Sequence, residues 1–380
     1  MCQLKIIFLK TIIFNKIKGR EKMKICVYAI SKNEEKHVKR WFESMKEADE
    51  IYVLDTGSTD KTRELLESLG AKVSSKIIKP WRFDTARNES LKLVPEDTDI
   101  CVCTDLDEVF NPGWRKKLEK AWTKETTQAK YTYNWSLDEN NNPKISFLYE
   151  KIHARNGYSW THPVHEVLAY SGTSPQTITI EDIVLNHYPD SKKSRGSYLQ
   201  LLELSVQESP EDDRNVHYLG REYMYYNRWT DAIKTLKKHL SLKTATWKDE
   251  RAASYRFIGR SYKNLGKIKE ARTYYNKAIK EAPHLRDGLV EKAILEYEQN
   301  NFKEVEKLCI KALCITNHEK TYINEIFSWN STIYDLLAIA CYNQKKYSYA
   351  IYFNTLALEK DPTNIRLLNN QKFYKEKEPF

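Results

Sequence analysis

The chain has 380 residues, which is more than one ordinary hydrophobic core holds and favours two compact units. Aromatic residues make up 12% of the chain and Gly and Pro are sparse, so the composition excludes a long disordered linker. The net charge is +10, but half of it lies in residues 1–22, and the remainder lacks the basic stripe that binds a phosphate backbone, which argues against nucleic acid as a partner.

Residues 1–22 are expected to be a leader or the product of a start codon assigned too early, because Met23 directly precedes the first predicted strand. Apolar pairs alternate with lysines here, and no span approaches the roughly 20 residues needed to cross a bilayer. No small-residue cleavage site follows. The alternative is a basic amphipathic anchor that makes peripheral contact with a membrane surface.

Residues 23–195 are predicted to form an α/β domain, because short apolar runs alternate with segments of helical spacing. The apolar runs are Ile25–Ile30, Ile51–Leu54 and 99–104, and the helical segments are 34–45 and 59–69. Such alternation builds a mostly parallel sheet covered by helices, and ligands gather at the carboxyl ends of its strands.

Seven cysteines are scattered along the chain without a Cys-x-x-Cys pair. This pattern indicates neither a disulfide framework nor a structural zinc site, and it favours a reducing compartment. We therefore predict a cytoplasmic location. Cys101 and Cys103 lie two residues apart in an apolar strand, so we expect both on one buried face of the sheet.

A polar turn over residues 55–60 follows the second predicted strand. Gly57 permits a tight turn, and Ser58 or Thr59 is suited to cap the following helix. That cap alone explains the pattern in one interpretation. In the other, Asp55 accepts a hydrogen bond from a nucleobase N–H, and the turn amides line a nucleotide pocket.

Asp105 and Asp107 follow the third apolar strand and are expected to point the same way from its end. Two carboxylates at that place are typical ligands of a Mg²⁺ or Mn²⁺ ion bound to a diphosphate. A solvated loop is the alternative, because an Asp-x-Asp pair is common by chance.

Residues 196–380 are predicted to be all-α, because a helix-turn-helix pattern repeats there with turns at residues 226–229, 265–268, 300–303 and 344–347. Small or aliphatic residues follow these turns at spacings of 39, 34 and 45, namely Ala232, Ala271, Val305 and Ala350. A unit near 34 residues resembles the tetratricopeptide repeat, and residues 253–283 match it best. We expect the concave surface of such repeats to hold an extended peptide or to support a homodimer.

Four short motifs of the front half occur in a fixed order, at residues 30–34, 55–60, 81–88 and 105–108. This ordered set resembles the family 2 glycosyltransferases with a GT-A fold, and the similarity covers about residues 24–190. The resemblance implies a nucleotide-sugar donor, a divalent metal cofactor (Mn²⁺ or Mg²⁺) and an inverting displacement.

The same resemblance assigns roles to individual residues. Asn33, Glu34 and Asp55 would border the nucleoside of the donor. Arg87 would hold the donor phosphates or ribose, with a helix-surface ion pair as the alternative. Asp105 would contact both the donor and the metal.

Residues 160–166 fall where such enzymes place their acceptor-side acid or base. An inverting transfer needs a carboxylate to take the proton of the acceptor, and Glu166 is the candidate catalytic base. A surface or salt-bridged glutamate is the alternative. A zinc site of His162, His165 and Glu166 is disfavoured, because no further ligands follow at a typical spacing.

His187 matches the late histidine that completes metal coordination in many GT-A enzymes, so the expected ligands are Asp105, Asp107 and His187. A neutral imidazole suits Mn²⁺ better than Mg²⁺. A core histidine is the alternative.

The predicted function is the transfer of a sugar from a UDP-sugar to an acceptor. The combination with repeats resembles bacterial glycosyltransferases that modify peptides or proteins, including the S-glycosyltransferases of glycosylated bacteriocins, and favours a polypeptide acceptor. Two alternatives stay open. One is the synthesis of a lipid-linked or cell-surface glycan, and the other is a non-catalytic repeat scaffold with an inactive sugar-nucleotide domain.

Overall fold

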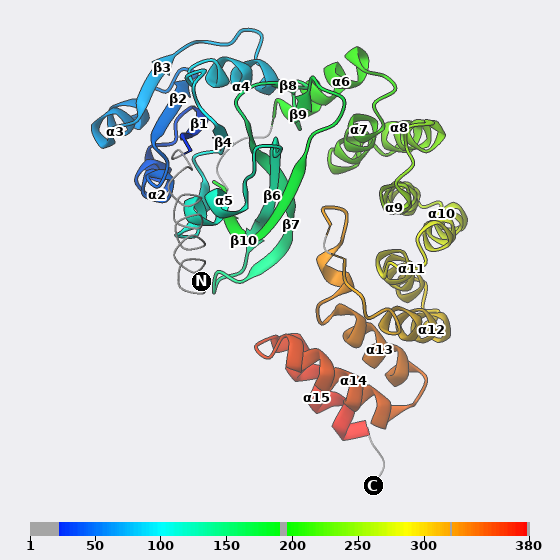
Figure 1. The fold of residues 1–380 in the computed structure, drawn as a ribbon. Coiled ribbons are helices and arrows are strands. Elements are labelled where there is room, and N and C mark those ends of the chain that lie inside the picture. The colour runs from blue at the N-terminus through cyan, green and yellow to red at the C-terminus, as the bar shows by residue number, and fades with distance from the viewer. Residues whose placement is uncertain (1–22, 191–195, 320, 378–380) are drawn as a thin grey trace, which may run out of the picture. The chain divides into compact units, whose positions relative to one another are not determined.

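A computed structural model describes residues 23–190, 196–319 and 321–377. The chain divides into two compact units, residues 1–193 and 194–380, which we call the front unit and the rear unit. Figure 1 shows a sheet with surrounding helices in the front unit and successive helices in the rear unit. The predicted leader, residues 1–22, lies outside the described residues.

The front unit is built on an eight-stranded sheet with the order β3-β2-β1-β4-β7-β6-β10-β5, beside a two-stranded sheet of β8 and β9. Strands β3, β2, β1 and β4 pair in parallel, and β6 pairs in parallel with β10. The strands are β1 (Ile25–Ser31), β2 (Glu50–Asp55), β3 (Lys72–Ser75), β4 (Ile100–Cys103), β5 (Glu108–Phe110), β6 (Gln128–Leu137), β7 (Pro143–Ala154), β8 (Tyr158–Thr161), β9 (Val167–Tyr170) and β10 (Thr177–His187).

Helices α2 (Glu35–Met45), α3 (Thr62–Leu69) and α4 (Phe83–Leu91) follow the first three strands in turn, and α5 (Trp114–Ala121) follows β5. The predicted alternation of strand and helix is therefore confirmed for the first part of the sheet. The later strand β7 pairs antiparallel with β4 and β6, because a short connection rather than a helical crossover joins β6 to β7.

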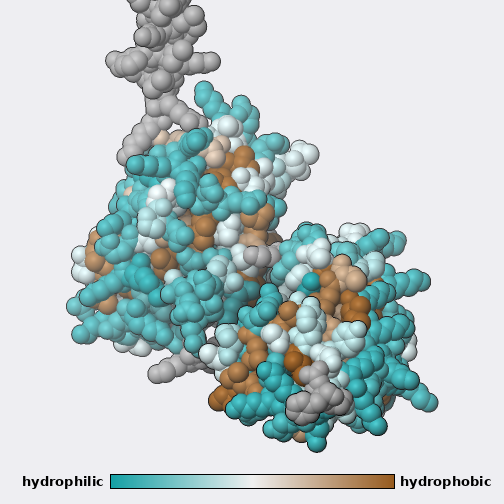
Figure 2. All heavy atoms as spheres, turned by 90° about the horizontal axis from the view of Figure 1, so that it is seen from below, coloured by the Kyte–Doolittle hydropathy of each residue, from teal (hydrophilic) through white to brown (hydrophobic). Residues whose placement is uncertain are grey.

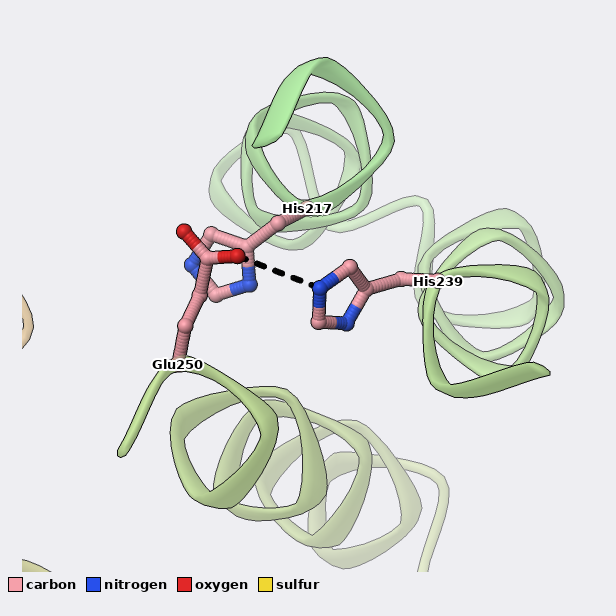
Figure 3. A group of neighbouring side chains, drawn as sticks. All are labelled: His217, His239 and Glu250. Atoms are coloured by element: carbon pink, nitrogen blue, oxygen red, sulfur yellow. Dashed lines mark hydrogen bonds and ion pairs between the residues drawn. The ribbon is translucent and has the colours of Figure 1, made fainter. Parts of the chain in front are cut away.

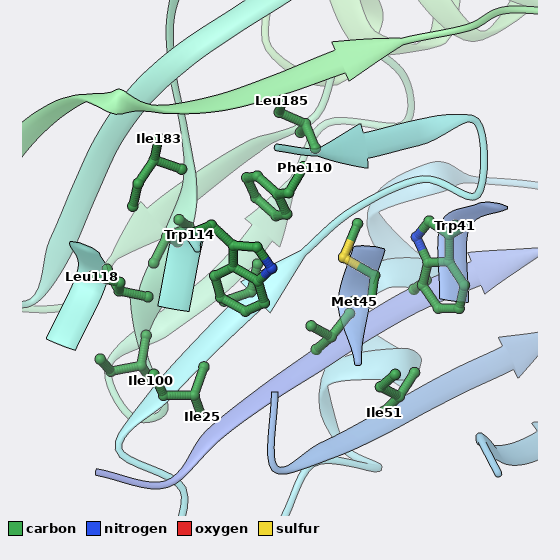
Figure 4. Packing of buried hydrophobic residues seen from close by; sticks show 14 of the residues in the cluster. Ile25, Trp41, Met45, Ile51, Ile100, Phe110, Trp114, Leu118, Ile183 and Leu185 are labelled. Carbon is green, nitrogen blue, oxygen red and sulfur yellow. The ribbon is translucent and has the colours of Figure 1, made fainter. Parts of the chain in front are cut away.

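Alternation along β1 creates two buried layers. Ile25 and Val27 face one side, where they pack with Trp41 and Met45 of α2 (Figure 4). Tyr28 faces the other side and packs in a second cluster that includes Trp160 of β8. Cys101 and Cys103 are fully buried in that same cluster, which confirms that they share one sheet face.

The rear unit is a series of helices, paired across short turns. They are α6 (Tyr198–Glu208), α7 (Asp213–Tyr225), α8 (Trp229–Ser241), α9 (Lys248–Asn264), α10 (Ile268–Glu281), α11 (Asp287–Glu298), α12 (Phe302–Leu313), the 3-10 helix η1 (Ile326–Ser328), α13 (Thr332–Asn343), α14 (Tyr347–Lys360) and α15 (Ile365–Lys377).

Each of the four predicted turns contains one residue in the left-handed region, with φ between 56° and 72°. These residues are Asn227, Gly266, Asn300 and Lys345. The small or aliphatic residues after the turns, Ala232, Ala271, Val305 and Ala350, are all fully buried. They therefore pack the helix pairs, as the repeat pattern predicted. The longer spacing before Ala350 reflects an inserted segment that contains η1.

Hydrophilic side chains cover most of the face shown in Figure 2, with smaller apolar patches between them. This agrees with the mean hydropathy of −0.68. Among the described residues, no helix combines the length and the apolar character needed to cross a bilayer.

Candidate active site

The loops after β1 and β2 are locked together by hydrogen bonds. The backbone N–H of Asn33 donates to Ser58 Oγ (2.9 Å), and Asn33 Oδ1 accepts from the N–H of Thr59 (2.7 Å). The N–H of Glu34 donates to Thr62 Oγ1 (2.7 Å). The carboxyl ends of these two parallel strands therefore meet at one edge of the sheet, with Asn33 and Glu34 in the loop between β1 and α2.

Asp55 is buried at the end of β2, where its carboxylate organises its own turn. Asp55 Oδ1 accepts from the N–H groups of Gly57 and Ser58, both at 3.0 Å, and Oδ2 accepts from the hydroxyl of Ser31 (3.2 Å). Gly57 has φ +111°, a conformation that glycine adopts without strain. Asp55 thus fixes the shape of the predicted nucleotide loop.

The predicted helix cap in this turn is wrong. Helix α3 begins only at Thr62, so Ser58 and Thr59 lie too far upstream to cap it. Asp60 Oδ1 instead accepts the N–H of Thr62 (3.0 Å), while Ser58 and Thr59 bond to the β1 loop and to Asp55.

Arg87 of α4 lies at the centre of an ion-pair cluster. Its Nη2 donates to both carboxylate oxygens of Asp105 (2.9 and 3.0 Å), and its Nε donates to Glu166 Oε1. Arg87 is only 3% exposed, so this is not a helix-surface ion pair. Burial disfavours its charge, but the carboxylates of Asp105 and Glu166 outweigh this and hold the pKa of Arg87 well above its usual value.

A second buried cation, Lys151 of β7, contacts the other side of the same carboxylate. Lys151 Nζ donates to Asp105 Oδ2 (3.1 Å) and lies 3.4 Å from Glu108 Oε1, which also accepts from the hydroxyl of Tyr133 (2.9 Å). Burial opposes the ionisation of Asp105, but Arg87 and Lys151 together hold its pKa well below the usual range. Asp105 is therefore an ionised group held between two cations.

Sequence reasoning missed Lys151 as a site residue. The available signal was a lysine next to Ile152, shortly after the aromatic and aliphatic run of residues 147–149. Lys151 has a fully buried neighbour in Ile152 and is itself buried. Buried lysines are rare unless a carboxylate pairs with them, but its partners lie more than 40 residues upstream.

Asp107 faces a different partner from Asp105. Its Oδ2 lies 3.5 Å from His187 Nε2, and its backbone carbonyl accepts from the N–H of Tyr188 (2.8 Å). His187 Nδ1 bonds to the carbonyl oxygen of Trp135 (2.9 Å), and the two rings stack at 4.6 Å. Burial disfavours the charged imidazole, but Asp107 and the Trp135 carbonyl outweigh it and raise the pKa of His187.

Glu166 lies in the connection between β8 and β9, and Arg87 holds it in place. The side chain of Asn88 braces the adjoining strand, because it bonds to both the carbonyl and the N–H of Trp160, each at 2.8 Å. Glu166 is thus the salt-bridged glutamate of the alternative interpretation. Its Oε1 accepts from Arg87, and its Oε2 has no hydrogen-bond partner among the described residues.

The three predicted metal ligands are not gathered into one group. Within the described residues, one group of three His, Cys, Asp or Glu side chains has its ligand atoms within 4.8 Å of one another, and this group lies in the rear unit. Asp107 and His187 do approach each other, whereas Asp105 turns to Arg87 and Lys151. The zinc alternative of His162, His165 and Glu166 is not assembled either.

A cavity of about 570 Å³ adjoins the Asp107–His187 pair. Helix α2, the β6–β7 connection and the end of β10 line it, with the residues Lys36, His37, Arg40, Ser136, Leu137, Asp138, Asn141, His187, Tyr188 and Pro189. Its basic and hydroxyl or amide groups are suited to bind a phosphorylated or polar ligand.

Two protein families and several known proteins are similar to parts of this chain. Residues 26–170 match the family model described as glycosyl transferase family 2, and residues 252–285 match that of the tetratricopeptide repeat. An uncharacterized glycosyltransferase of Rickettsia bellii is 31% identical over 115 residues, which are 30% of this chain and 38% of that protein. One of Rickettsia typhi is 46% identical over 59 residues, which are 15% of this chain and 19% of that protein.

Solved structures of repeat proteins are similar to part of the chain. The match to the crystal structure of MamA has a sequence identity of 18% and a TM-score of 0.37, and it covers 47% of this chain and 99% of that chain. The pilF protein of Pseudomonas aeruginosa is 12% identical with a TM-score of 0.37, over 47% of this chain and 72% of that one.

The matched segment spans less than two fifths of these Rickettsia proteins. The family match over residues 26–170 lies in the front unit, where the parallel strands, their interlocked loops and the Asp105–Glu108 motif meet. The front unit of this chain is a family 2 glycosyltransferase domain with a GT-A-like fold, and the rear unit carries a tetratricopeptide repeat.

Proposed function

We propose that this chain transfers a sugar from a UDP-sugar to a polypeptide acceptor, with inversion at the anomeric carbon and with Mn²⁺ or Mg²⁺ as cofactor. The observation that carries the proposal is the meeting of Asp107 and His187 beside the Arg87–Asp105–Lys151 ion pairs, at the carboxyl ends of the strands. Ligands of open α/β sheets bind at that edge.

The nucleoside of the donor would lie against the interlocked loops after β1 and β2. Asn33 and Glu34 border this region, and Asp55 fixes the loop through the N–H groups of its turn. The donor phosphates would lie beyond Asp105, near Arg87 and Lys151. Both cations already pair with carboxylates, so neither is an unpaired buried charge before the donor binds.

The side chains of Asp107 and His187 offer an oxygen and a nitrogen atom that fit a divalent metal ion. The bond from His187 Nδ1 to the Trp135 carbonyl fixes the tautomer and leaves Nε2 aimed at the Asp107 carboxylate, the arrangement that holds a ligating histidine. Asp105 fits less well, because Arg87 and Lys151 engage both of its oxygens. A bound ion would supply Lewis-acid stabilisation of the departing diphosphate.

Glu166 is the proposed base toward the acceptor. Arg87 fixes its orientation through Oε1, while Oε2 is left to accept the proton of the acceptor nucleophile. The repeats of the rear unit support a polypeptide acceptor, because such arrays commonly present a concave surface to an extended peptide. The six cysteines of the described residues are all free thiols, which supports a cytoplasmic reaction.

The test is release of UDP by the purified full chain, with a panel of UDP-sugars and Mn²⁺ or Mg²⁺, for the unaltered chain and for Asp107→Asn. We expect the substitution to lower turnover by roughly 100-fold or more, because several kcal/mol of transition-state stabilisation depend on the ion. The matched control is Asp97→Asn, an aspartate that pairs with Lys24 and is 72% exposed.

Equal turnover in Asp107→Asn and the unaltered chain would overturn the metal assignment. Absence of UDP release with every UDP-sugar, and of UDP binding with Mn²⁺, would overturn the donor class. A polypeptide acceptor requires a mass increment of one sugar on a peptide from a lysate of the source organism, and an increment found only on lipid would overturn that part.

A further inference from the structure

Three buried polar side chains meet in the rear unit, far along the chain from the front site. They are His217 of α7, His239 of α8 and Glu250 of α9, and Figure 3 shows them pointing toward one another from three separate helices. One donor atom of each lies within 4.8 Å of the others. The two imidazoles are 0% exposed and the carboxylate is 3% exposed.

A single hydroxyl connects the two imidazoles. Ser254 Oγ lies 2.8 Å from His217 Nδ1 and 2.9 Å from His239 Nδ1. His239 Nε2 lies 3.2 Å from Glu250 Oε1, and the second carboxylate oxygen of Glu250 accepts from the hydroxyl of Tyr322. The Nδ1 atoms of both rings are thereby occupied, while His239 Nε2 faces the Glu250 carboxylate.

The hydrogen bonds leave one buried nitrogen without a partner. Assigning the protons from Glu250 backwards, His239 Nε2–H donates to the carboxylate, Ser254 O–H donates to His239 Nδ1, and His217 Nδ1–H donates to Ser254. His217 Nε2 then has only its lone pair, and it has no hydrogen-bond partner among the described residues. A buried polar atom in this state costs about 1–3 kcal/mol, and native structures usually provide a ligand for it.

We propose that His217, His239 and Glu250 bind one divalent transition-metal ion, Zn²⁺ by its donor set, which clamps α7, α8 and α9 together. His217 Nε2, His239 Nε2 and Glu250 Oε1 are the ligands. His239 shifts its single proton from Nε2 to Nδ1, so that Ser254 Oγ accepts N–H bonds from both rings and its own hydrogen turns away. Outer hydrogen bonds of this kind orient ligating histidines.

The chemistry of the donors selects the ion. Two imidazoles and one carboxylate form a set that zinc uses, with the fourth position left to a water molecule. The cluster offers a single carboxylate beside two imidazoles, which disfavours Ca²⁺ and Mg²⁺, because these ions prefer oxygen ligands. The cluster contains no thiolate, which disfavours Cu(I).

The pKa values of His217 and of Glu250 both lie below the usual values of these groups. Burial lowers the pKa of His217 to about 3, so its ring is neutral. Burial opposes the ionisation of Glu250, but hydrogen bonds from His239 and Tyr322 lower its pKa to about 2.

The proposal concerns the stability of the repeats and does not depend on sugar transfer. Helices α7 and α8 form one helix pair, and α9 begins the next, so the ion would join two consecutive repeats. The test uses the purified full chain, stripped with a chelator and then dialysed against Zn²⁺. We expect one zinc ion per chain by elemental mass spectrometry and a higher melting temperature for the rear unit.

The variants His217→Gln and Glu250→Gln should each lose this equivalent of zinc. The matched control His284→Gln alters a histidine of the same unit that pairs with Asp249 outside the cluster, and it should keep the zinc. The variant Asp107→Asn should also keep it, which separates the cluster from the proposed metal of the front site.

Co²⁺ gives a second readout that does not depend on the folding of any variant. The stripped, unaltered chain should develop the visible absorption of four-coordinate Co²⁺, and one equivalent of Zn²⁺ should displace it. Less than stoichiometric zinc in the unaltered chain, or equal zinc in the unaltered chain and His217→Gln, would overturn the proposal and leave a plain hydrogen-bonded core.

Discussion

The two units each contain a buried polar cluster, and the clusters are held together in different ways. In the front unit, three carboxylates surround two cations, and every charge of Arg87 and Lys151 has a carboxylate partner. In the rear unit, hydrogen bonds run from Glu250 through His239 and Ser254 and end at a nitrogen of His217 that has no partner within the part of the chain that the structure describes.

This difference indicates which cluster needs a ligand for its own stability. Paired opposite charges keep the front cluster intact before any substrate binds, so its side chains would already be in place for the proposed donor. The rear cluster is one interaction short, and a bound ion would complete it. Catalytic preorganisation and structural metal binding therefore place opposite demands on buried polar groups.

The largest expected effect follows from removing the central cation of the front cluster. Arg87→Ala removes a buried cation and leaves the partly buried carboxylates of Asp105 and Glu166 without this partner, so we expect the front unit to lose about 3–5 kcal/mol of unfolding free energy. Chemical denaturation checks this, with hydrogen exchange in β4 used to assign the front-unit transition. A loss confined to the rear unit would contradict it.

Acidification tests a buried histidine of the front unit that, unlike His217, has partners among the described residues for both ring nitrogens. His153 in the front unit has both nitrogens engaged, with Nε2 2.8 Å from the hydroxyl of Tyr28 and Nδ1 2.7 Å from the Ala154 carbonyl. Burial lowers the pKa of His153 from 6.5 to about 4. Below pH 6.5 the unfolded chain therefore binds a proton that the folded chain refuses.

Stability of the front unit should accordingly fall as the pH drops from 6.5 to about 4, and His153 should contribute nothing further below that value. A shift of this size corresponds to about 3 kcal/mol. Denaturation of the unaltered chain and of His153→Gln at several pH values isolates the contribution. Parallel pH profiles for the two proteins would refute the assignment.

Local features of this fold could be predicted from the sequence, and long-range ones could not. The four turns of the repeats could be predicted because each lies between two amphipathic segments and is followed by a small or aliphatic residue. The structure adds that each turn contains a left-handed residue, as at Asn227 and Gly266. The partner of Asp105 was missed because Lys151 reaches it only through the antiparallel pairing of β4 with β7, where Val102 lies opposite Ile152. No local pattern encodes that register.

The assignment of roles at the front site shows the same limit. Asp105 and Asp107 lie two residues apart after one strand, and this spacing suggested a shared metal ion. In the structure the two carboxylates have different partners. The pairing of β5 with β10 brings His187 beside Asp107, whereas Arg87 and Lys151 bond to Asp105. Spacing alone could not distinguish these two environments.

Close contact between neighbouring helices of the rear unit can be measured by a pair of glycine substitutions. A Cβ at Gly259 of α9 would lie 2.8 Å from a ring carbon of Tyr275. Alanine normally stabilises a helix relative to glycine, but here we expect Gly259→Ala to cost about 1–3 kcal/mol.

Gly266 is the matched control, because an added Cβ there meets no atom within 4 Å. Its φ of +72° alone should make Gly266→Ala cost about 1 kcal/mol. Thermal unfolding of the rear unit compares the two variants. A smaller loss for Gly259→Ala than for Gly266→Ala would show that the α9–α10 contact adapts readily.

The smallest effect is expected at an exposed ion pair of the front unit, the counterpart of the buried Arg87 pairs. Arg63 Nε donates to Glu67 Oε1 (2.8 Å) on the surface of α3, and both side chains are about half exposed. Water and salt screen such a pair, so Arg63→Gln should leave the denaturation midpoint of the front unit unchanged within error. A clear loss of stability in low salt that disappears in high salt would mean that surface ion pairs also stabilise this unit. Burial would then explain less of the stability of the front cluster.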